Sequence, residues 1–314
     1  MTSGLKKELP ILRKKEKGKK DGRRERGIAI KKTSAALFFV LIVSFISAGS
    51  EAAASWPQER EDEVKAVKPA ADRIGQAYLI QFKEDFFHLL TSPREWQGPD
   101  IMNLAAIFGT GTVFFTLDQD IFNWVAERRS SFSQDLARIF TKAGDGAWLL
   151  GFCGTLYGLG EIFKKPHWRR TALLSLESLA ISSASVASLK FLIGRSRPHA
   201  WEGSQSFHPF STSSRYTSFP SGHACAAFSV AASIAGESKS RSIDILVYSV
   251  ATLAAVARVH DEAHWASDVL VGSALGYFIG RGVVNLHRQE KRRFSFQVYP
   301  LKEGLAASFC FSLD

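Results

Sequence analysis

The 314-residue chain has a formal net charge of +10, but that charge is concentrated at one end. Residues 1–32 hold 13 Lys and Arg against 4 Asp and Glu, which leaves the rest of the chain almost neutral and argues against a nucleic-acid-binding protein. The three cysteines, Cys153, Cys225 and Cys310, provide neither a disulfide framework nor the spacing of a metal site.

The N-terminal region predicts export to the cell envelope. Its basic stretch is followed by a mainly apolar run, Ser34–Ala48, and then by small residues as far as Ala54. This order is typical of a secretory signal that is cleaved after Ala54. The basic stretch is long for a signal, so an uncleaved anchor and a start codon placed too far upstream are the alternatives. We therefore expect residues 1–54 to be a basic N-region with a signal peptide or anchor.

Residues 55–100 are expected to form a linker and one amphipathic helix. Apolar side chains recur at helical spacing through this stretch, at Ile74, Ala77, Tyr78, Phe82, Phe86 and Leu89. Such a stripe predicts a helix that rests on the protein core or on a membrane surface.

Six apolar segments follow and predict a helical domain over residues 101–290. They are 101–117, 146–163, 171–194, 221–236, 243–257 and 267–286. Several are shorter than the ~20 residues that a membrane span needs, and some carry charge, as at Glu161, Glu177 and Arg281. Both a membrane-spanning bundle and a water-soluble periplasmic bundle remain open.

The polar joints between these segments differ in charge. Residues 164–170, 237–242 and 287–293 are basic and fall on one side of an alternating bundle. The positive-inside rule places that side in the cytoplasm and the opposite side outside it. Six full spans after an exported N-terminus would give the reverse orientation. That conflict is removed if segment 101–117 is only interfacial, if the N-terminal flank is not translocated, or if the bundle is soluble.

Three polar motifs lie on the side opposite the basic joints. They are Lys190–Pro198 (K-F-L-I-G-R-S-R-P), Pro220–His223 (P-S-G-H) and Arg258–Asp268 (R-V-H-D-E-A-H-W-A-S-D). Because residues four apart share a helix face, Asp268 is expected to contact His264 and to fix its tautomer. Backbone N–H groups at a helix start bind anions, and His223 supplies a second imidazole as a proton donor. Together the motifs predict nucleophilic attack on a bound phosphate.

In this order and spacing, the motifs resemble those of the type 2 phosphatidic acid phosphatases, which share a superfamily with vanadium haloperoxidases and bacterial class A acid phosphatases. The resemblance covers roughly Asn103–Leu286, and Ala257 stands where the family usually has Ser. It implies an all-α fold, a six-helix bundle of the phosphatidic acid phosphatase/haloperoxidase type, and phosphatase chemistry without a metal or other cofactor.

The resemblance also implies a role for each motif residue. The phosphate would be bound by Lys190, Arg197, Ser221, Gly222 and Arg258. His264, oriented by Asp268, would attack phosphorus and form a phosphohistidine. His223 would protonate the leaving oxygen and then activate water. His260 and Asp261 are expected to lie beside this set or on the surface.

The loop between the first two motifs, residues 199–219, is long for a compact domain and is therefore a candidate functional loop. Trp201, Phe207, Phe210 and Tyr216 would contact an acyl chain there, and Arg215 would add positive charge. The alternative is a packed lid without a role in specificity.

The C-terminal residues 291–314 change to a two-residue period. Phe294, Phe296 and Val298 alternate with polar residues, and so do Phe309, Phe311 and Leu313. This pattern predicts a short β-hairpin with one apolar face.

The function expected is hydrolysis of a phosphomonoester or pyrophosphate, with a phosphorylated lipid or polyprenyl pyrophosphate as substrate. The protein is expected in the inner membrane, with its site facing the periplasm and no nucleic-acid partner. One alternative is a soluble periplasmic acid phosphatase or a vanadium-dependent haloperoxidase. Another is a non-enzymatic envelope assembly protein. The sequence leaves the individual substrate and the oligomeric state open.

Overall fold

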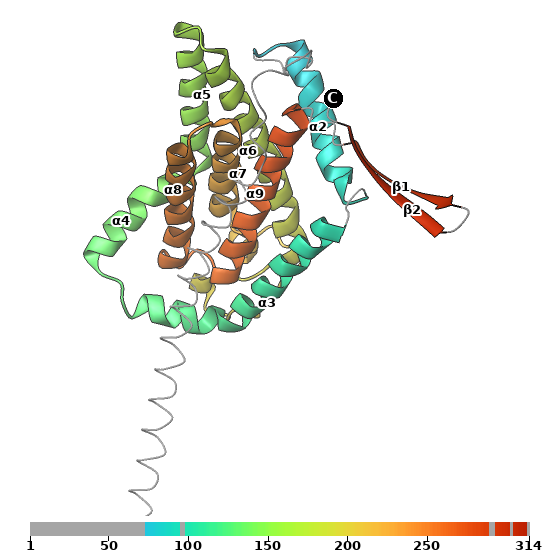
Figure 1. Cartoon of the computed structure of the whole chain (residues 1–314). Coiled ribbons are helices and arrows are strands. Elements are labelled where there is room, and N and C mark those ends of the chain that lie inside the picture. Colours follow the sequence, from blue (N-terminus) through green and yellow to red (C-terminus); the bar gives the residue numbers. More distant parts are fainter. Residues whose placement is uncertain (1–72, 95–97, 289–292, 302–303, 313–314) are drawn as a thin grey trace, which may run out of the picture.

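The computed structural model describes residues 73–94, 98–288, 293–301 and 304–312. The predicted signal or anchor and most of the predicted linker lie outside these residues. The described part contains eight α-helices: α2 (Gln76–Thr91), α3 (Gly98–Ala126), α4 (Ser131–Lys142), α5 (Gly146–Ile162), α6 (Pro166–Ile193), α7 (Gly222–Glu237), α8 (Arg241–His260) and α9 (Ala266–Arg288). Short 3₁₀ turns lie at Ser92–Arg94, Pro198–Ala200 and Ser214–Tyr216. The predicted all-helical domain is therefore confirmed (Figure 1).

The predicted number of six helices is wrong. The amphipathic stripe on α2 packs on the bundle, where Phe82, Phe86 and Leu89 contact a buried apolar cluster on α6 and α9. Helix α4 was not predicted at all. It is half polar and buries only Ala137, so it contains no apolar run to search for. Local chemistry nonetheless defines its start, because Ser130 and Ser133 form a reciprocal capping box.

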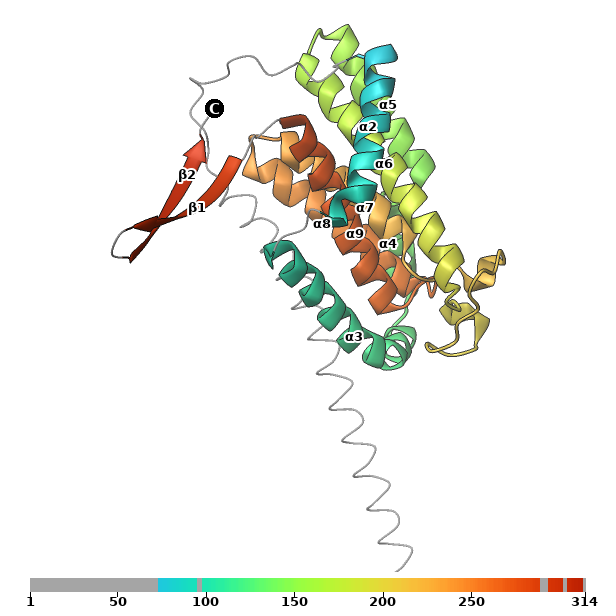
Figure 2. The ribbon, with the colours of Figure 1, turned by 90° about the vertical axis from the view of Figure 1, so that its right-hand side faces the viewer.

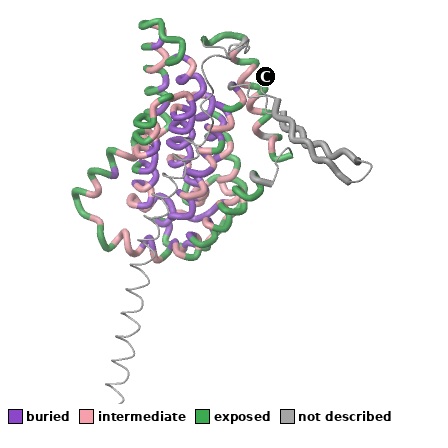
Figure 3. The backbone as a smooth tube through the Cα atoms, in the orientation of Figure 1, coloured by how far each residue is buried: buried purple, intermediate pink, exposed green. Residues whose placement is uncertain are grey.

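Helix α7 lies at the centre of the bundle and is buried along almost its whole length (Figure 3). It packs against α6, α8 and α9. Small residues allow this close approach. A Cβ atom added at Gly276 of α9 would stand 2.1 Å from the carbonyl oxygen of Cys225, and one at Gly272 would stand 2.5 Å from that of Ser221. The glycine face of α9 therefore fixes where α7 begins.

The chain leaves α6 through a glycine that no other residue could replace without rearrangement. Gly194 caps the helix in the left-handed conformation, with φ of 62°. A Cβ atom at this position would lie 1.8 Å from the carbonyl oxygen of His208. The long loop thus folds back onto the end of α6, and an isolated bridge between Arg195 and Phe207 continues that contact.

The three basic joints meet at one end of the bundle, as predicted. Arg170 pairs with Glu237 at 2.9 Å and donates to the backbone carbonyl of His287 at 3.1 Å, so one side chain connects all three joints. The last turns of α6 and α8 and the first turns of α7 and α9 lie at the other end. Helix α3 reaches this second end, close to the 194–221 loop (Figures 1 and 2).

Four of the described helices are long and apolar enough to cross a membrane, judged by length and composition. They are Asp100–Ala126, Pro166–Ile193, Arg241–His260 and Ala266–His287. Of these four, Asp100–Ala126 is the least covered by the rest of the protein, since only 6% of its most apolar 18-residue window is buried. An apolar helix with so little protein contact is suited to a lipid environment, which fits a membrane protein.

The C-terminal strands β1 (Arg293–Leu301) and β2 (Gly304–Ser312) pair in antiparallel register, with Phe294 opposite Phe311 and Leu301 opposite Gly304. Their side chains are not among those described, so the predicted apolar face of this hairpin stays a prediction.

Candidate active site

Two cations of the first motif converge on one residue of the long loop. The Lys190 ammonium donates to the backbone carbonyl of Thr217, and the Arg197 guanidinium donates to the Thr217 hydroxyl at 3.1 Å. The backbone N–H of Arg197 also donates to the carbonyl of Arg215 at 2.9 Å. The loop therefore holds both cations in place at the end of α6. Arg215 takes part in this contact through its backbone carbonyl, and the residue is otherwise exposed.

Arg258, near the end of α8, is oriented by polar partners behind it. Its guanidinium lies 3.4 Å from Thr141 Oγ1 and 3.4 Å from Asp261 Oδ2, and Thr141 also donates to Asp261 at 3.0 Å. Asp261, which was expected beside the motif residues or on the surface, lies beside them and contacts a motif cation. His260 instead lies 3.0 Å from Ser133 of α4.

Each of the two motif arginines has one buried guanidinium N–H group without a hydrogen-bond partner in the described part of the chain. These groups belong to Nε of Arg197 and Nε of Arg258. Buried donors are almost always paired in native proteins, because an unpaired buried donor is costly. An anion that accepted from both would remove that cost.

The His264 ring is buried and its orientation is fixed by a backbone carbonyl. Its Nδ1 lies 2.6 Å from the carbonyl oxygen of Ser218. Because a carbonyl oxygen only accepts hydrogen bonds, Nδ1 must carry the proton. In the neutral imidazole, Nε2 then has the free lone pair.

The predicted direct contact between Asp268 and His264 is not made. The two residues approach only to 4.0 Å, too far for a hydrogen bond. Asp268 instead accepts from the Ser218 hydroxyl at 2.5 Å, from Arg195 at 2.5 Å and from the backbone N–H of Trp265 at 3.0 Å. Asp268 and the imidazole are therefore connected only through Ser218, whose hydroxyl donates to Asp268 and whose carbonyl accepts from His264.

Arg195 and Asp118 are buried polar residues that the sequence analysis missed. Arg195 donates to Asp118 of α3 at 2.7 Å as well as to Asp268, and Ser267 bonds both Arg195 and Asp118. A carboxylate inside a long apolar helix is a signal of function or of a buried partner, and Asp118, one residue past the predicted segment 101–117, could have been singled out on that basis. Arg195 was overlooked because it lies between the two motif cations.

The anion cradle predicted at the start of α7 needs a correction. The backbone N–H of Ser221 donates to the carbonyl of Asp268 at 3.0 Å, so it is occupied. The Ser221 hydroxyl oxygen caps the helix by accepting from Ala224 N–H, which leaves its own proton free to donate. Gly222 and His223 occupy the first turn, where N–H groups have no partner within the helix. The backbone N–H groups left free for an anion therefore begin one residue further along the chain, at Gly222.

His223 extends from the same helix start, toward the joint between α4 and α5. Its Nε2 lies 3.9 Å from Asp145 Oδ2, and Asp145 also caps α5 through the N–H groups of Ala147 and Trp148. Gly144 contacts the His223 backbone so closely that a Cβ atom there would lie 2.7 Å from its carbonyl oxygen. Asp145 is thus a further site residue that the sequence did not reveal.

Burial, reinforced by the nearby cations, lowers the pKa of both histidines. Burial, together with the positive charges of Lys190, Arg197 and Arg258, holds the pKa of His264 well below its usual value. Burial and then Arg258 lower the pKa of His223 to about 4, with Asp145 opposing the shift. Both rings are therefore neutral at neutral pH.

The long loop is organised by Glu202, which was also not predicted. Its carboxylate accepts from Ser196, Ser206 and Tyr216 and lies 3.0 Å from His208. Hydrogen bonds from Ser196 and His208 lower the Glu202 pKa to about 2. Tyr216 stacks on His208, whereas Trp201 and Phe210 are exposed, at 79% and 64%. Phe207 is exposed as well, at 42%, and stacks on Phe115 of α3.

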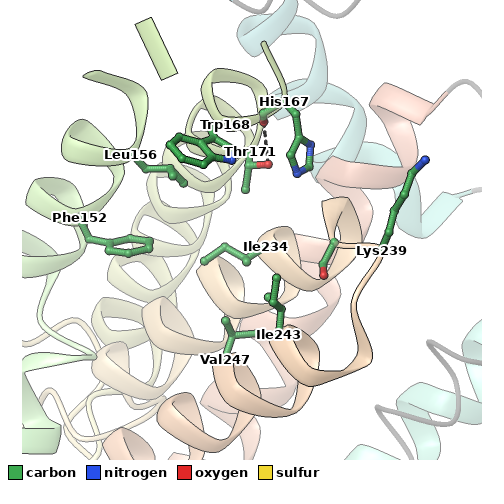
Figure 4. Close-up of a pocket in the computed structure, with 10 residues that line it drawn as sticks. Phe152, Leu156, His167, Trp168, Thr171, Ile234, Lys239, Ile243 and Val247 are labelled. Carbon is green, nitrogen blue, oxygen red and sulfur yellow. Dashed lines mark hydrogen bonds between the residues drawn. The ribbon is translucent and has the colours of Figure 1, made fainter. Parts of the chain in front are cut away.

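A crevice of about 290 Å³ lies at the opposite end of the bundle (Figure 4). It is lined by Phe152, Leu156, His167, Trp168, Thr171, Ile234, Ser238, Lys239, Ile243 and Val247. None of the motif residues is among them, so this crevice is not the candidate active site.

The fold and the site define a helical-bundle protein with two neutral histidines beside a cluster of cations. Residues 171–292 match the family model of the PAP2 superfamily. A lipid A 1-phosphatase of Rhizobium etli is 31% identical over 169 residues, which cover 48% of this chain and 70% of that protein. The chain therefore belongs to the PAP2 superfamily, as the motifs predicted.

A lipid A 1-phosphatase of Porphyromonas gingivalis is 27% identical over 165 residues, covering 51% of this chain. The match spans only 34% of the length of that relative. Among solved structures, the crystal structure of Aquifex aeolicus LpxE aligns with a TM-score of 0.43 and 22% identity, covering 54% of this chain and 94% of that one. A PAP2-type phosphatidylglycerolphosphate phosphatase from Bacillus subtilis aligns with a TM-score of 0.47 and 24% identity, covering 60% and 98%.

Proposed function

We propose that the protein is a lipid phosphatase that removes phosphate from a membrane lipid through a phosphohistidine intermediate. The observation that carries the proposal is the pair of buried, unpartnered guanidinium N–H groups of Arg197 and Arg258, whose positive charges also act on the buried imidazole of His264. The anionic oxygens of a phosphoryl group accept strong hydrogen bonds from guanidinium N–H groups, so a bound phosphate would satisfy both donors. Membership of the PAP2 superfamily supports the same chemistry.

In the first step, Nε2 of His264 attacks phosphorus while the bond to the leaving oxygen breaks. Lys190, Arg197 and Arg258 stabilise the charge that the phosphoryl oxygens carry in the transition state. The Ser221 hydroxyl and the first free N–H groups of α7 donate to the same oxygens. The carbonyl of Ser218 keeps the ring aligned, because its hydrogen bond to Nδ1–H fixes both tautomer and direction.

His223 supplies the proton for the leaving oxygen. It is neutral in the free protein, so the proton comes from the substrate monoanion, and the bound phosphate then stabilises the imidazolium. In the second step His223 accepts a proton from water. The resulting hydroxide attacks phosphorus, the bond to His264 breaks, His223 passes its proton to the product phosphate, and inorganic phosphate leaves.

The substrate we propose is a lipid phosphate, with lipid A 1-phosphate as the first to test. Two relatives carry the name lipid A 1-phosphatase. The exposed Trp201 and Phe210 belong to the loop whose Thr217 and Ser218 contact the motif residues, so a lipid chain could lie beside a bound phosphate. A site in the cell envelope facing the periplasm, with the basic joints in the cytoplasm, completes the proposal.

The test is a substrate panel assayed with the purified full-length protein in detergent and EDTA. The panel contains lipid A, phosphatidate, phosphatidylglycerophosphate and undecaprenyl pyrophosphate, with phosphate release as the measurement. We expect release from lipid A at a rate at least about tenfold above the others, and loss of release in the Arg258→Met variant. If no lipid is hydrolysed but vanadate-loaded protein oxidises bromide faster than free vanadate, the phosphatase proposal is wrong and the haloperoxidase alternative replaces it.

A further inference from the structure

A second cluster of ionisable side chains lies inside the bundle, far from the motifs. It consists of Asp85 on α2, Glu177 on α6 and His287 on α9. Along α6, Glu177 precedes Lys190 by 13 residues, which corresponds to about 20 Å of helix. The cluster therefore lies toward the end where the basic joints meet. The three residues are far apart in the sequence, which is why their spacing did not indicate a common site.

The geometry of this cluster does not match a simple ion pair. Nε2 of His287 lies 2.8 Å from Asp85 Oδ2 and 3.3 Å from Glu177 Oε2. The nearer oxygen makes no hydrogen bond, because the ring N–H is aligned with Glu177. The ring N–H is directed at Glu177, so Asp85 Oδ2 lies beside the ring nitrogen without a hydrogen bond of acceptable geometry.

Glu177 provides a second, independent observation. Its side chain is fully buried, and its other oxygen, Oε1, has no hydrogen-bond partner among the described residues. Two carboxylates beside one imidazole give the cluster an excess of negative charge when both are ionised. Burying such unpaired charge is expensive unless a cation or a proton neutralises it.

We propose that Asp85, Glu177 and His287 bind a divalent first-row metal ion such as Zn²⁺ or Mn²⁺. One ligand atom from each residue lies within 4.8 Å of the other two. Tetrahedral ligands ~2.0–2.1 Å from zinc lie about 3.3 Å from each other, so small side-chain movements would suffice. The imidazole suits Zn²⁺ in particular and the two carboxylates also suit Mn²⁺, whereas Mg²⁺ and Ca²⁺ prefer all-oxygen ligands.

Gln81 is placed to complete the site. Its side-chain Nε2 lies 3.0 Å from Nδ1 of His287, and a half-turn of the amide would place its oxygen there instead. When Nε2 of His287 binds the metal, Nδ1 carries the proton, and the Gln81 amide presents its oxygen to accept it. Such an outer hydrogen bond is the usual support for a metal-bound imidazole. The ion would join α2 to α6 and α9, so it stabilises the fold and takes no part in the phosphate chemistry.

The experiment uses the purified full-length protein in detergent, stripped with EDTA and dialysed. Binding of Zn²⁺ and Mn²⁺ is measured by calorimetry, bound metal by elemental analysis, and stability by Tm. We expect about one ion per chain and a Tm that rises with metal concentration. The variants Glu177→Gln and His287→Gln should lose at least ~10-fold in affinity.

Two control variants lie at the same end of the bundle outside the cluster. Glu237→Gln removes a buried carboxylate that pairs with Arg170, and His167→Gln removes an imidazole from an exposed position. Both should bind metal as the unmodified protein does. If Glu177→Gln does not fold, Asp85→Asn replaces it, because Asp85 is partly exposed and lies on the peripheral α2. The visible spectrum of bound Co²⁺ should then change in Asp85→Asn.

The proposal is overturned if the stripped protein binds none of these ions and its Tm does not respond to them. It is equally overturned if Glu177→Gln or Asp85→Asn binds as tightly as the unmodified protein. The triad would then be a protonated histidine between two carboxylates. Neither result bears on phosphate release, which is measured separately.

Discussion

At the scale of single residues, the chemistry depends on which nitrogen of His264 is free. The Ser218 carbonyl occupies Nδ1, so Nε2 is the nitrogen left free for the proposed attack. Asp268 does not contact the ring but supports Ser218, because it accepts hydrogen bonds from the Ser218 hydroxyl and from Arg195. His223 begins a different helix and has Asp145 beside it. Replacing each histidine is therefore expected to impair a different step of the proposed reaction.

The first prediction separates the two histidines. His264→Ala should lose the covalent intermediate and almost all turnover with every substrate. His223→Ala should slow lipid hydrolysis by ~10²–10⁴-fold, because it removes a general acid and base. An activated aryl phosphate needs little protonation of its leaving group, so His223→Ala should still be phosphorylated by it and should accumulate phosphoenzyme. Acid quenching with labelled substrate measures this, and label retained on His264→Ala would reverse the assignment.

The second prediction concerns pH. The pKa of His223 is about 4, so its imidazole is neutral above that value and protonated below it. The substrate loses its last phosphate proton near pH ~6. The reactive pair needs one proton in total, shared between His223 and the substrate. We therefore expect kcat/KM to be level between about pH 4 and 6 and to fall on either side. A rising limb centred near the ordinary histidine pKa of ~6.5 would contradict the cationic environment described here.

At the scale of elements, the contact between α7 and α9 sets the position of the second motif. Gly272, Gly276 and Gly280 follow one face of α9, and each lies against a carbonyl oxygen of Ser221 or of α7. Backbone touches backbone along this face, so α7 cannot shift without displacing Ser221 and His223. At the start of α7, the backbone N–H of Ser221 donates to the carbonyl of Asp268. This hydrogen bond connects the second and third motifs directly.

The third prediction tests this contact with Gly276→Ala. The new methyl group would lie 2.1 Å from the Cys225 carbonyl oxygen, so the helices must separate. We expect a loss of ~1–3 kcal/mol in the free energy of unfolding, as for other overpacked cores, and a lower kcat. Gly154→Ala is the matched control on α5, where nothing lies within 4 Å of the new Cβ. It should be neutral or stabilising by up to ~1 kcal/mol. Equal Tm values for the two variants would refute the packing argument.

At the scale of the whole molecule, the bundle separates two kinds of polar site. The cationic residues and both motif histidines lie at one end. The basic joints, the Asp85–Glu177–His287 cluster and the apolar crevice lie toward the other. A change at one end need not alter the other, since about 20 Å of helix α6 lies between Glu177 and Lys190.

The fourth prediction follows from that separation. EDTA should lower Tm by removing the ion from the Asp85 cluster, while phosphate release at a temperature well below Tm stays within about twofold of its initial rate. Vanadate should inhibit competitively, because its trigonal-bipyramidal form resembles phosphorus during transfer and binds the same cations. Phosphate release that disappears with EDTA and returns with metal, at constant folded fraction, would exclude the histidine mechanism proposed here.

The sequence alone determined the helical class, the two ends of the bundle and the three motifs, because these are local properties. Apolar runs specify helices, and motif residues at the ends of alternating helices must meet at one end. The helix count failed at α4, where half the residues are polar. Only the tertiary structure decided the partner of His264, the role of Arg195 and Asp118, and the Asp85–Glu177–His287 cluster. In each case the competing partners come from segments far apart in the chain, and packing decides which of them lies within hydrogen-bond distance.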